Sequence, residues 1–447
     1  MHKHIGFLLA IALLLILTFG SVGADEGQDL LLVTISGNNG ENIELNLYDP
    51  AADISTPLLA NYTANDSAYS NAILSADGRL AFSASFEGHI TAHILDTKHL
   101  DQLVTMVTNV GSADEYPLSW SPNGKLLAYQ SLSHDGPALF SVWDGETSVD
   151  VTPQNIQTNV SQYFNLAWSP DGHTLAFEAY QADNQGHIYV WDGKTTVDVT
   201  PQALDSSQVY YDDLAWSSDG RLVFTVQDNL DSLSEVYVWD GHTTMSVSQN
   251  PTGNDVKPVW STDGQLAFQS ERNGAYSVLV WDGVSIKDGL PDTSTFSTVA
   301  PEVTINLSFP AWTSTGQLAF VGQSGQDRNA QIYLWDGESA TNISQNPTQI
   351  NANPVWNPDG RWAFTNYIAQ VQYVYVKDAD NQSLLMTKGS GAGKPAWSST
   401  GFLTFCTLDE QEWVLSVWNG TEVREIARGP HVRAQWQSGG SVDCFSG

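Results

Sequence analysis

The chain contains few cysteines, few basic side chains and few long apolar runs. Two cysteines occur in 447 residues, and 17 lysines and arginines stand against 50 aspartates and glutamates, for a net charge of −33. A field of this sign repels phosphate backbones and anionic lipid headgroups. The composition therefore argues against nucleic acid and membrane surfaces as partners, and it favours a partner that carries positive charge.

The cysteines, Cys406 and Cys444, lack the CxxC spacing and the histidine neighbours of a zinc site. In an oxidising compartment they can form one disulfide, which would tie the C-terminal tail to the repeat before it. Two buried free thiols are the alternative, because spacing along the chain does not fix the geometry of a bridge.

The one long apolar run extends from Ile5 to Phe19, after a weakly basic start and before the small residues Val22 and Ala24. This order is typical of a cleavable signal peptide. The run is short for a spanning helix, which needs about 20 residues, and an uncleaved N-terminal anchor is the alternative. We expect residues 1–24 to be a signal peptide. Residues 25–447 are then one exported domain, periplasmic, at the cell surface or extracellular, with no membrane attachment after cleavage.

A repeat of about 45 residues occupies the rest of the chain. Its first mark is a tryptophan that recurs at intervals of 39 to 52 residues and is followed by a glycine turn. These tryptophans are Trp120, Trp168, Trp216, Trp260, Trp312, Trp356, Trp397 and Trp436. The flanks alternate apolar and polar residues, and Asp-Gly and Asn-Gly pairs separate them, which predicts short strands joined by hairpins. Each unit therefore contains four antiparallel strands, and no segment of the mature chain has a sustained helical period.

Such units bury their faces by stacking radially, so the fold class is all-β, a β-propeller of four-stranded antiparallel blades. Leu74 begins one more unit, with leucine in place of the tryptophan, which brings the count of first strands to nine. The strands near residues 31–35 and 43–49 have no first strand before them, and Trp436 has no full blade after it. We predict nine blades, closed by pairing of the N- and C-terminal strands. Eight is the alternative, because residues 441–445 can compete with residues 31–35.

The string Trp168-Ser169-Pro170-Asp171-Gly172 with Leu175-Ala176-Phe177, followed by Ile188-Tyr189-Val190, resembles the WD-like repeat of TolB-type propellers. The resemblance extends over residues 28–445. It implies a propeller, and it implies that one face of the ring grips a peptide segment.

No catalytic constellation appears in the sequence. The periodic tryptophans fit blade-to-blade packing, and the Asp-Gly carboxylates fit turn capping. No calcium loop, phosphate loop or Gly-x-Ser-x-Gly elbow is complete. We therefore predict no catalytic residue, no metal and no cofactor.

The candidate binding residues lie in the loops before the first strand, where acidic and aromatic residues share an offset from the tryptophan in consecutive units. They are Asp114, Glu115, Tyr116, Tyr163, Tyr210, Tyr211, Asp212, Asp213 and Asp255. Loops on a rigid scaffold commonly carry function. An insertion near residues 286–305 is a second candidate contact.

These features predict a secreted, non-catalytic propeller, monomeric, that binds a protein or peptide, with a basic partner preferred. The alternative is an extracellular carbohydrate-active enzyme, a lyase or hydrolase with its site at the propeller channel. Such an enzyme would need carboxylates from separate blades, whose approach a sequence does not reveal.

Overall fold

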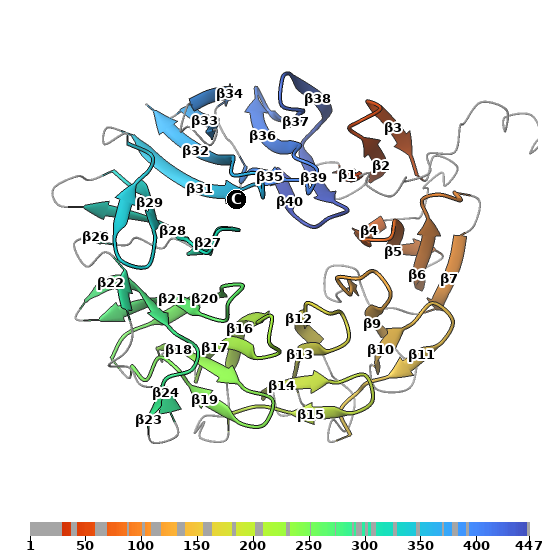
Figure 1. The fold of residues 1–447 in the computed structure, drawn as a ribbon. Coiled ribbons are helices and arrows are strands. Elements are labelled where there is room, and N and C mark those ends of the chain that lie inside the picture. Colours follow the sequence, from red (N-terminus) through yellow and green to blue (C-terminus); the bar gives the residue numbers. More distant parts are fainter. Residues whose placement is uncertain are drawn as a thin grey trace, which may run out of the picture.

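The protein is a ring of nine blades in a computed structural model (Figure 1). The described part of the chain runs from residue 29 to residue 444, so the predicted signal segment 1–24 lies outside it. Within that range the following segments are not described: 37–42, 59–68, 87–88, 101–102, 109–117, 132–138, 155–162, 181–184, 202–208, 229–232, 251, 273, 288–289, 292–296, 300–302, 305–309, 325–328, 346–348, 369–370, 378–382 and 390–392. No helix of the described residues is long and apolar enough to cross a membrane.

Each blade is an antiparallel sheet, numbered here in chain order and given from its inner to its outer strand. Blade 2 contains β4 (Tyr69–Leu74), β5 (Arg79–Phe86), β6 (His89–Asp96) and β7 (Leu103–Thr108). Blade 3 contains β8 (Ser119–Trp120), β9 (Leu127–Ser131), β10 (Leu139–Trp143) and β11 (Ser148–Asp150). Blade 4 contains β12 (Tyr163–Trp168), β13 (Leu175–Tyr180), β14 (Gly186–Trp191) and β15 (Thr196–Asp198). Blade 5 contains β16 (Tyr210–Trp216), β17 (Leu222–Gln227), β18 (Ser234–Trp239) and β19 (Thr244–Ser246).

The second half of the ring repeats this order with two irregular blades. Blade 6 contains β20 (Asp255–Trp260), β21 (Leu266–Arg272), β22 (Ala275–Trp281) and β25 (Ser297–Val299), with the small hairpin β23 (Ile286–Lys287) and β24 (Leu290–Pro291) inserted before β25. In blade 7 two short strands, β26 (Val303–Thr304) and β27 (Ala311–Trp312), pair with β28 (Leu318–Ser324), followed by β29 (Gln331–Trp335) and β30 (Ala340–Asn342). Blade 8 contains β31 (Ile350–Trp356), β32 (Trp362–Ile368), β33 (Val371–Lys377) and β34 (Ser383–Gly389). Blade 9 contains β35 (Ala396–Trp397), β36 (Leu403–Asp409), β37 (Glu412–Trp418) and β38 (Val423–Gly429).

Blade 1 is assembled from both ends of the chain. The strands β1 (Leu31–Ser36), β2 (Glu44–Asp49) and β3 (Ile54–Pro57) are joined by β39 (His431–Trp436) and β40 (Ser441–Cys444), in the order β3-β2-β1-β39-β40. Trp436 pairs with Leu31, so β39 is the missing first strand of this blade. The prediction of nine blades closed by the terminal strands is confirmed. β40 does not compete with β1, because it pairs with the opposite edge of β39 and becomes a fifth, innermost strand (Figure 1).

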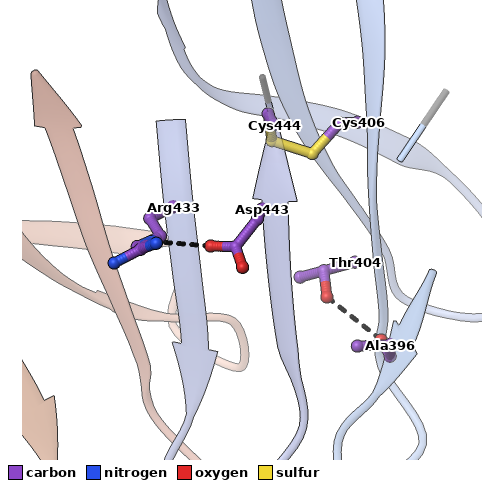
Figure 2. The surroundings of a disulfide bond; sticks show 6 residues. All are labelled: Ala396, Thr404, Cys406, Arg433, Asp443 and Cys444. Carbon is purple, nitrogen blue, oxygen red and sulfur yellow. Dashed lines mark hydrogen bonds and ion pairs between the residues drawn. A yellow bond between two sulfur atoms is a disulfide. The ribbon is translucent and has the colours of Figure 1, made fainter. Parts of the chain in front are cut away.

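Two further contacts fasten the ends of the chain. The carboxylate of Asp29, just before β1, accepts the backbone N–H groups of Ser399 at 2.7 Å and Ser438 at 2.9 Å. These serines lie in turns of blade 9 and blade 1. A disulfide joins Cys406 on β36 to Cys444 on β40, with 5.7 Å between their Cα atoms (Figure 2). The innermost strand is therefore bonded covalently to the neighbouring blade.

The periodic tryptophans join each blade to the one before it. The indole N–H of Trp168 donates to the carbonyl of Ser119 at 3.2 Å, and that of Trp216 donates to Ala167 at 2.9 Å. In both bonds the acceptor is the residue before the first-strand tryptophan of the preceding blade. Trp312 and Trp397 make the same bond. Trp120 makes it to Ile73, which precedes Leu74, the residue at the tryptophan position of blade 2. At these five positions the indole packs and hydrogen-bonds between blades at once, whereas the buried Trp260 Nε1 has no hydrogen-bond partner.

The closing tryptophan uses a relay instead of this direct bond. Trp436 Nε1 donates to Thr404 Oγ1 at 3.1 Å. That hydroxyl donates in turn to the carbonyl of Ala396 at 3.0 Å, a bond that Figure 2 shows. Trp436 is 0% exposed, whereas Trp168 and Trp216 are half-buried. The junction between blades 9 and 1 is thus the most deeply packed of these indole contacts.

The hairpin carboxylates cap turns, as the sequence predicts. Asp192 Oδ1 accepts the backbone N–H groups of Lys194 at 2.9 Å and Thr195 at 2.8 Å. These N–H donors, that of Thr195 first, hold the pKa of the Asp192 carboxyl below its usual range. The aspartates of the other Trp-Asp-Gly strings at positions 144, 240, 282 and 336 make the same pair of bonds.

Three arginines are clamped between two tryptophans of the following blade. They are Arg79, Arg221 and Arg361, each directly after an Asp-Gly pair in blades 2, 5 and 8. The guanidinium of Arg221 lies 4.5 Å from the ring centre of Trp260 and 5.8 Å from that of Trp281. It also donates to the carbonyls of Gly283 at 2.6 Å and Gly264 at 3.0 Å. Each arginine therefore joins two blades by charge-assisted hydrogen bonds and cation–π contacts.

Replacing Arg221 by alanine is expected to lower the free energy of unfolding by about 3 kcal/mol, because two bonds to charged donors and the cation–π contacts are lost together. Urea unfolding of residues 25–447 measures this loss. The matched control is Arg433→Ala, whose side chain is 66% exposed and pairs with Asp443 on the surface, and which should change stability by no more than about 1 kcal/mol. Equal effects of the two substitutions would contradict the clamp.

Candidate functional site

A β-bulge interrupts the inner strand of several blades three residues before the tryptophan. The register between first and second strands shifts in β4, β12, β16, β20 and β31. Four residues at the bulge have positive φ, namely Asn165, Asp213, Lys257 and Asn353, with φ between 50° and 56°. A bulge adds one residue to the strand, so the side chains before it face the opposite side from that which strict alternation predicts.

This reversal decides where the predicted residues lie. In β16 the core-facing residues are Trp216, Leu214 and Tyr211, followed toward the N-terminus by Val209 just before the strand. The spacing is two residues except between Leu214 and Tyr211, where it is three. β12 follows the same course through Trp168, Leu166 and Tyr163. The position five residues before the tryptophan therefore points into the interface between blades.

Three predicted binding residues occupy this buried position, and the expectation that they offer side chains to a partner is wrong for them. Tyr163 is 0% exposed and stacks on Phe140 of blade 3 at 4.8 Å. Tyr211 is 5% exposed against Phe224, and Asp255 is 0% exposed with Asn250 Nδ2 at 3.4 Å from its Oδ1. Burial raises the pKa of Asp255 to about 6.

The remaining predicted residues divide into three groups. Asp212 is exposed on the inner strand of blade 5, and Tyr210 and Asp213 are half-buried beside it. Asp114, Glu115 and Tyr116 lie outside the described residues. Of the insertion near residues 286–305, the structure describes parts of the β23–β24 hairpin, β25 and β26.

The bulge side chains link neighbouring blades through polar contacts. Asp213 Oδ1 lies 3.0 Å from Lys257 Nζ, and Asp213 Oδ2 accepts the backbone N–H of Lys257 at 3.2 Å. In the blade before, Asn165 Nδ2 donates to the carbonyl of Tyr211 at 2.9 Å and to Glu178 Oε2 at 2.7 Å. Blades 4, 5 and 6 thus share a polar belt along their inner strands, made of Asn165, Glu178, Asp212, Asp213 and Lys257.

Among the carboxyl groups of this belt, that of Glu178 has the pKa furthest from its usual value. It is 2% exposed, and burial, with the charge of Asp212 as a further contribution, raises its pKa to about 7. The sequence gives no sign of this, because Glu178 follows Phe177 in an ordinary Leu-Ala-Phe strand. A buried acid near neutrality can take up or release a proton at physiological pH.

The elevated pKa predicts a falling stability with rising pH. In the folded state Glu178 keeps its proton up to about pH 7, whereas in the unfolded chain it loses the proton near pH 4.5. The contribution of protonated Glu178 to the free energy of unfolding is therefore complete below pH 4.5 and is lost as the pH rises from 4.5 to 7. Compared with Glu178→Gln, the native chain should be about equally stable at pH 4.5 and about 3 kcal/mol less stable at pH 8. Urea unfolding of both chains across this range measures the difference. A difference that does not change with pH would contradict the assignment.

Three hollows lie along the inner wall beside β39 and β40, away from blades 4 to 6. One of about 330 Å³ lies between Leu74, Trp120 and Gln437, in blades 2, 3 and 1. A second of about 290 Å³ lies between Ala72, Arg433 and Asp443. The third, of about 440 Å³, is bounded by Trp356, Lys394 and Ser441. Sequence reasoning missed all three, although Leu74 at a tryptophan position is a visible signal for the first.

Among the described residues, no group of three or more histidine, cysteine, aspartate or glutamate side chains is placed to hold a metal ion. The candidate site consists of the hydrogen-bonding groups of the polar belt and the aromatic and polar linings of the three hollows. Such surfaces can recognise a ligand by shape, by hydrogen bonds and by charge.

Comparisons with known proteins establish the fold alone. No protein-family model and no curated protein matches the chain. A structure described as a eukaryotic initiation factor is similar over 92% of this chain and 98% of its own, at 14% identity and a TM-score of 0.55. Prolyl endopeptidases match 79% of this chain and 55% of their own at 12% identity, with a TM-score of 0.44. TolB from Acinetobacter baumannii matches 82% and 81% at 15% identity, with a TM-score of 0.34. The last two scores support no argument about function, and the TolB-type repeat stays a resemblance.

Proposed function

We propose that the chain is an exported, non-catalytic propeller, monomeric, that binds a protein or peptide segment at the inner wall of its ring. The observation that carries this proposal is the exposed Asp212 of the polar belt, on the inner strand of blade 5. Its carboxylate is exposed to solvent, and the chain as a whole carries a net charge of −33. A lysine or arginine of a partner would gain a charge-assisted bond there.

The belt supports this role because it is rigid and incompletely neutralised. Lys257 neutralises Asp213, whereas the exposed carboxylate of Asp212 accepts the backbone N–H of Asp213, a neutral donor. The inner strands that hold these groups are fixed by the indole contacts between blades. A partner would therefore meet a preorganised surface, which lowers the entropic cost of binding.

Panning a peptide library displayed on phage against residues 25–447 tests the proposal. We expect selected peptides to be enriched in lysine and arginine, and their affinity to fall as salt rises. Asp212→Asn should weaken their binding about tenfold with unchanged stability, since one charge-assisted bond is lost. Asp150→Asn, the same change on the outer strand of blade 3, is the matched control and should have no effect.

Two results would contradict the proposal. If the selected peptides bind Asp212→Asn as tightly as they bind the native chain, the Asp212 carboxylate does not contribute to the interface. Turnover of any member of a polysaccharide panel would instead favour the carbohydrate-active alternative, for which no observation in the described residues speaks.

A further inference from the structure

Blade 2 is the one blade whose first strand lacks the tryptophan. Leu74 pairs with Leu80 in the register in which Trp120 pairs with Leu127 and Trp168 with Leu175. Leu74 therefore occupies the tryptophan position of the repeat. A leucine is smaller than an indole and has no side-chain N–H to donate to the preceding blade.

A cavity lies beside Leu74. It has a volume of about 330 Å³ and lies between the inner strands of three blades. Its wall includes Leu74 of blade 2, Trp120 of blade 3, and Gln435 and Gln437 of blade 1. Pockets that bind small ligands have volumes of about 300–1,000 Å³, so this cavity has room for one ring system.

The wall excludes charged ligands on chemical grounds. The residues that line it comprise apolar side chains, serines, Gly439 and two glutamines, and none of them is ionisable. An ammonium or carboxylate group would lose its hydration there without a counter-ion. A neutral group with a large apolar surface fits the wall better, and the exposed part of Trp120 offers an aromatic surface for contact.

One hydrogen-bond acceptor in this wall is unused. Gln435 Oε1 accepts the backbone N–H of Leu74 at 3.2 Å, and Gln437 Nε2 donates to the carbonyl of Ala76 at 2.7 Å. Gln437 Oε1 is buried and has no hydrogen-bond partner. A buried acceptor without a partner costs about 1–3 kcal/mol, which a ligand N–H would recover once the Gln437 side chain rotates to turn this oxygen toward the cavity.

We infer that this cavity binds the indole side chain of a tryptophan on a partner polypeptide. The guest ring takes the place that each of the other blades fills with its own tryptophan, and its N–H donates to Gln437 Oε1. The inference rests on the proposed peptide-binding function and names the side chain that the partner supplies. It assigns to blades 1, 2 and 3 a recognition pocket separate from the polar belt of blades 4 to 6.

The first experiment fills the cavity from within. N-acetyl-5-fluorotryptophan amide, observed by fluorine NMR, is expected to bind the native chain saturably. Leu74→Trp should weaken this binding at least tenfold, because the new indole occupies the cavity, and it should unfold at an equal or higher urea concentration than the native chain. Val284→Trp, which adds a tryptophan at a residue that is 75% exposed, is the matched control and should bind the probe as the native chain does. Equal binding by Leu74→Trp, or no saturable binding by the native chain, would overturn the inference.

A second experiment tests the hydrogen bond and does not depend on the folding of Leu74→Trp. The probe methylated on its indole nitrogen has no N–H and should bind the native chain about tenfold more weakly than the unmethylated probe. Gln437→Leu lacks the acceptor and should bind the two probes with equal affinity. The same preference in the native chain and in Gln437→Leu would overturn the assignment of Gln437.

The panned peptides separate this inference from the proposed function. If they bind Leu74→Trp as tightly as the native chain, the indole pocket is wrong and the proposed function stands. If panning yields no peptide while the free probe still binds and Leu74→Trp blocks it, the pocket stands and the proposed function fails.

Discussion

Replacing Trp436 by alanine is expected to lower the free energy of unfolding by about 3–5 kcal/mol, the cost of removing a large side chain from a core. Trp436 is 0% exposed, packs 6.3 Å from the ring centre of Phe402 and donates to Thr404 Oγ1. Its strand, β39, is joined to β1 by hydrogen bonds, and these two strands come from opposite ends of the chain. The substitution therefore weakens the packing among β1, β39 and blade 9, where the two ends of the chain meet. Urea unfolding followed by circular dichroism measures the loss.

Trp312→Ala is the matched control for this prediction. Trp312 donates its indole N–H to Val259 at 3.1 Å in the usual way, but it is half-buried and lies in the middle of the chain. We expect it to cost about half as much as Trp436→Ala, since less apolar surface is uncovered. Limited proteolysis should cut the Trp436→Ala chain faster near its termini. Equal losses for both tryptophans would show that closure is no weaker than the other junctions.

The fold could be predicted from the sequence because each unit repeats its own turns and tryptophan. The spacing of Trp168, Trp216 and their counterparts counts the blades directly, and the unpaired Trp436 indicates the closure. Position within a strand was harder to predict. The bulge at Asp213 shifts the alternation by one residue, so Tyr211 turns into the core and Asp212 turns outward. No motif in the sequence marks a bulge whose positive-φ residue is an asparagine, an aspartate or a lysine and not a glycine.

Some features of the candidate site can be predicted from the repeat, and others cannot. A departure such as Leu74 stands out against eight tryptophans, and it coincides with a cavity. Gln437 and Asp29 belong to no repeated motif, and their contacts arise only when the two ends of the chain meet. The elevated pKa of Glu178 likewise depends on the neighbouring blade that buries it. Properties that arise between blades therefore escape a reading of one unit at a time.

Removing the disulfide is the second change for which we expect a large effect. The bridge encloses a sequence separation of 38 residues, for which loop-closure entropy in the unfolded chain corresponds to about 4 kcal/mol of stabilisation. Cys406→Ala with Cys444→Ala should therefore unfold with a free energy lower by about that amount. β40 lies at the inner edge of blade 1, where its other attachment is its pairing with β39, so this strand should also exchange its amide hydrogens faster.

The unaltered chain in a reducing agent is the control for the double substitution, because it retains both side chains and loses the bond. Both sulfur-bearing residues are 0% exposed, so we expect the reductant to act slowly on the folded chain and quickly once urea opens it. After reduction, its unfolding curve should move close to that of the double variant, whose own curve should not respond to the reductant. Two titratable thiols in the unreduced, unfolded chain would contradict the bridge itself. A double variant whose free energy of unfolding lies within about 1 kcal/mol of that of the native chain would contradict a stabilising role for it.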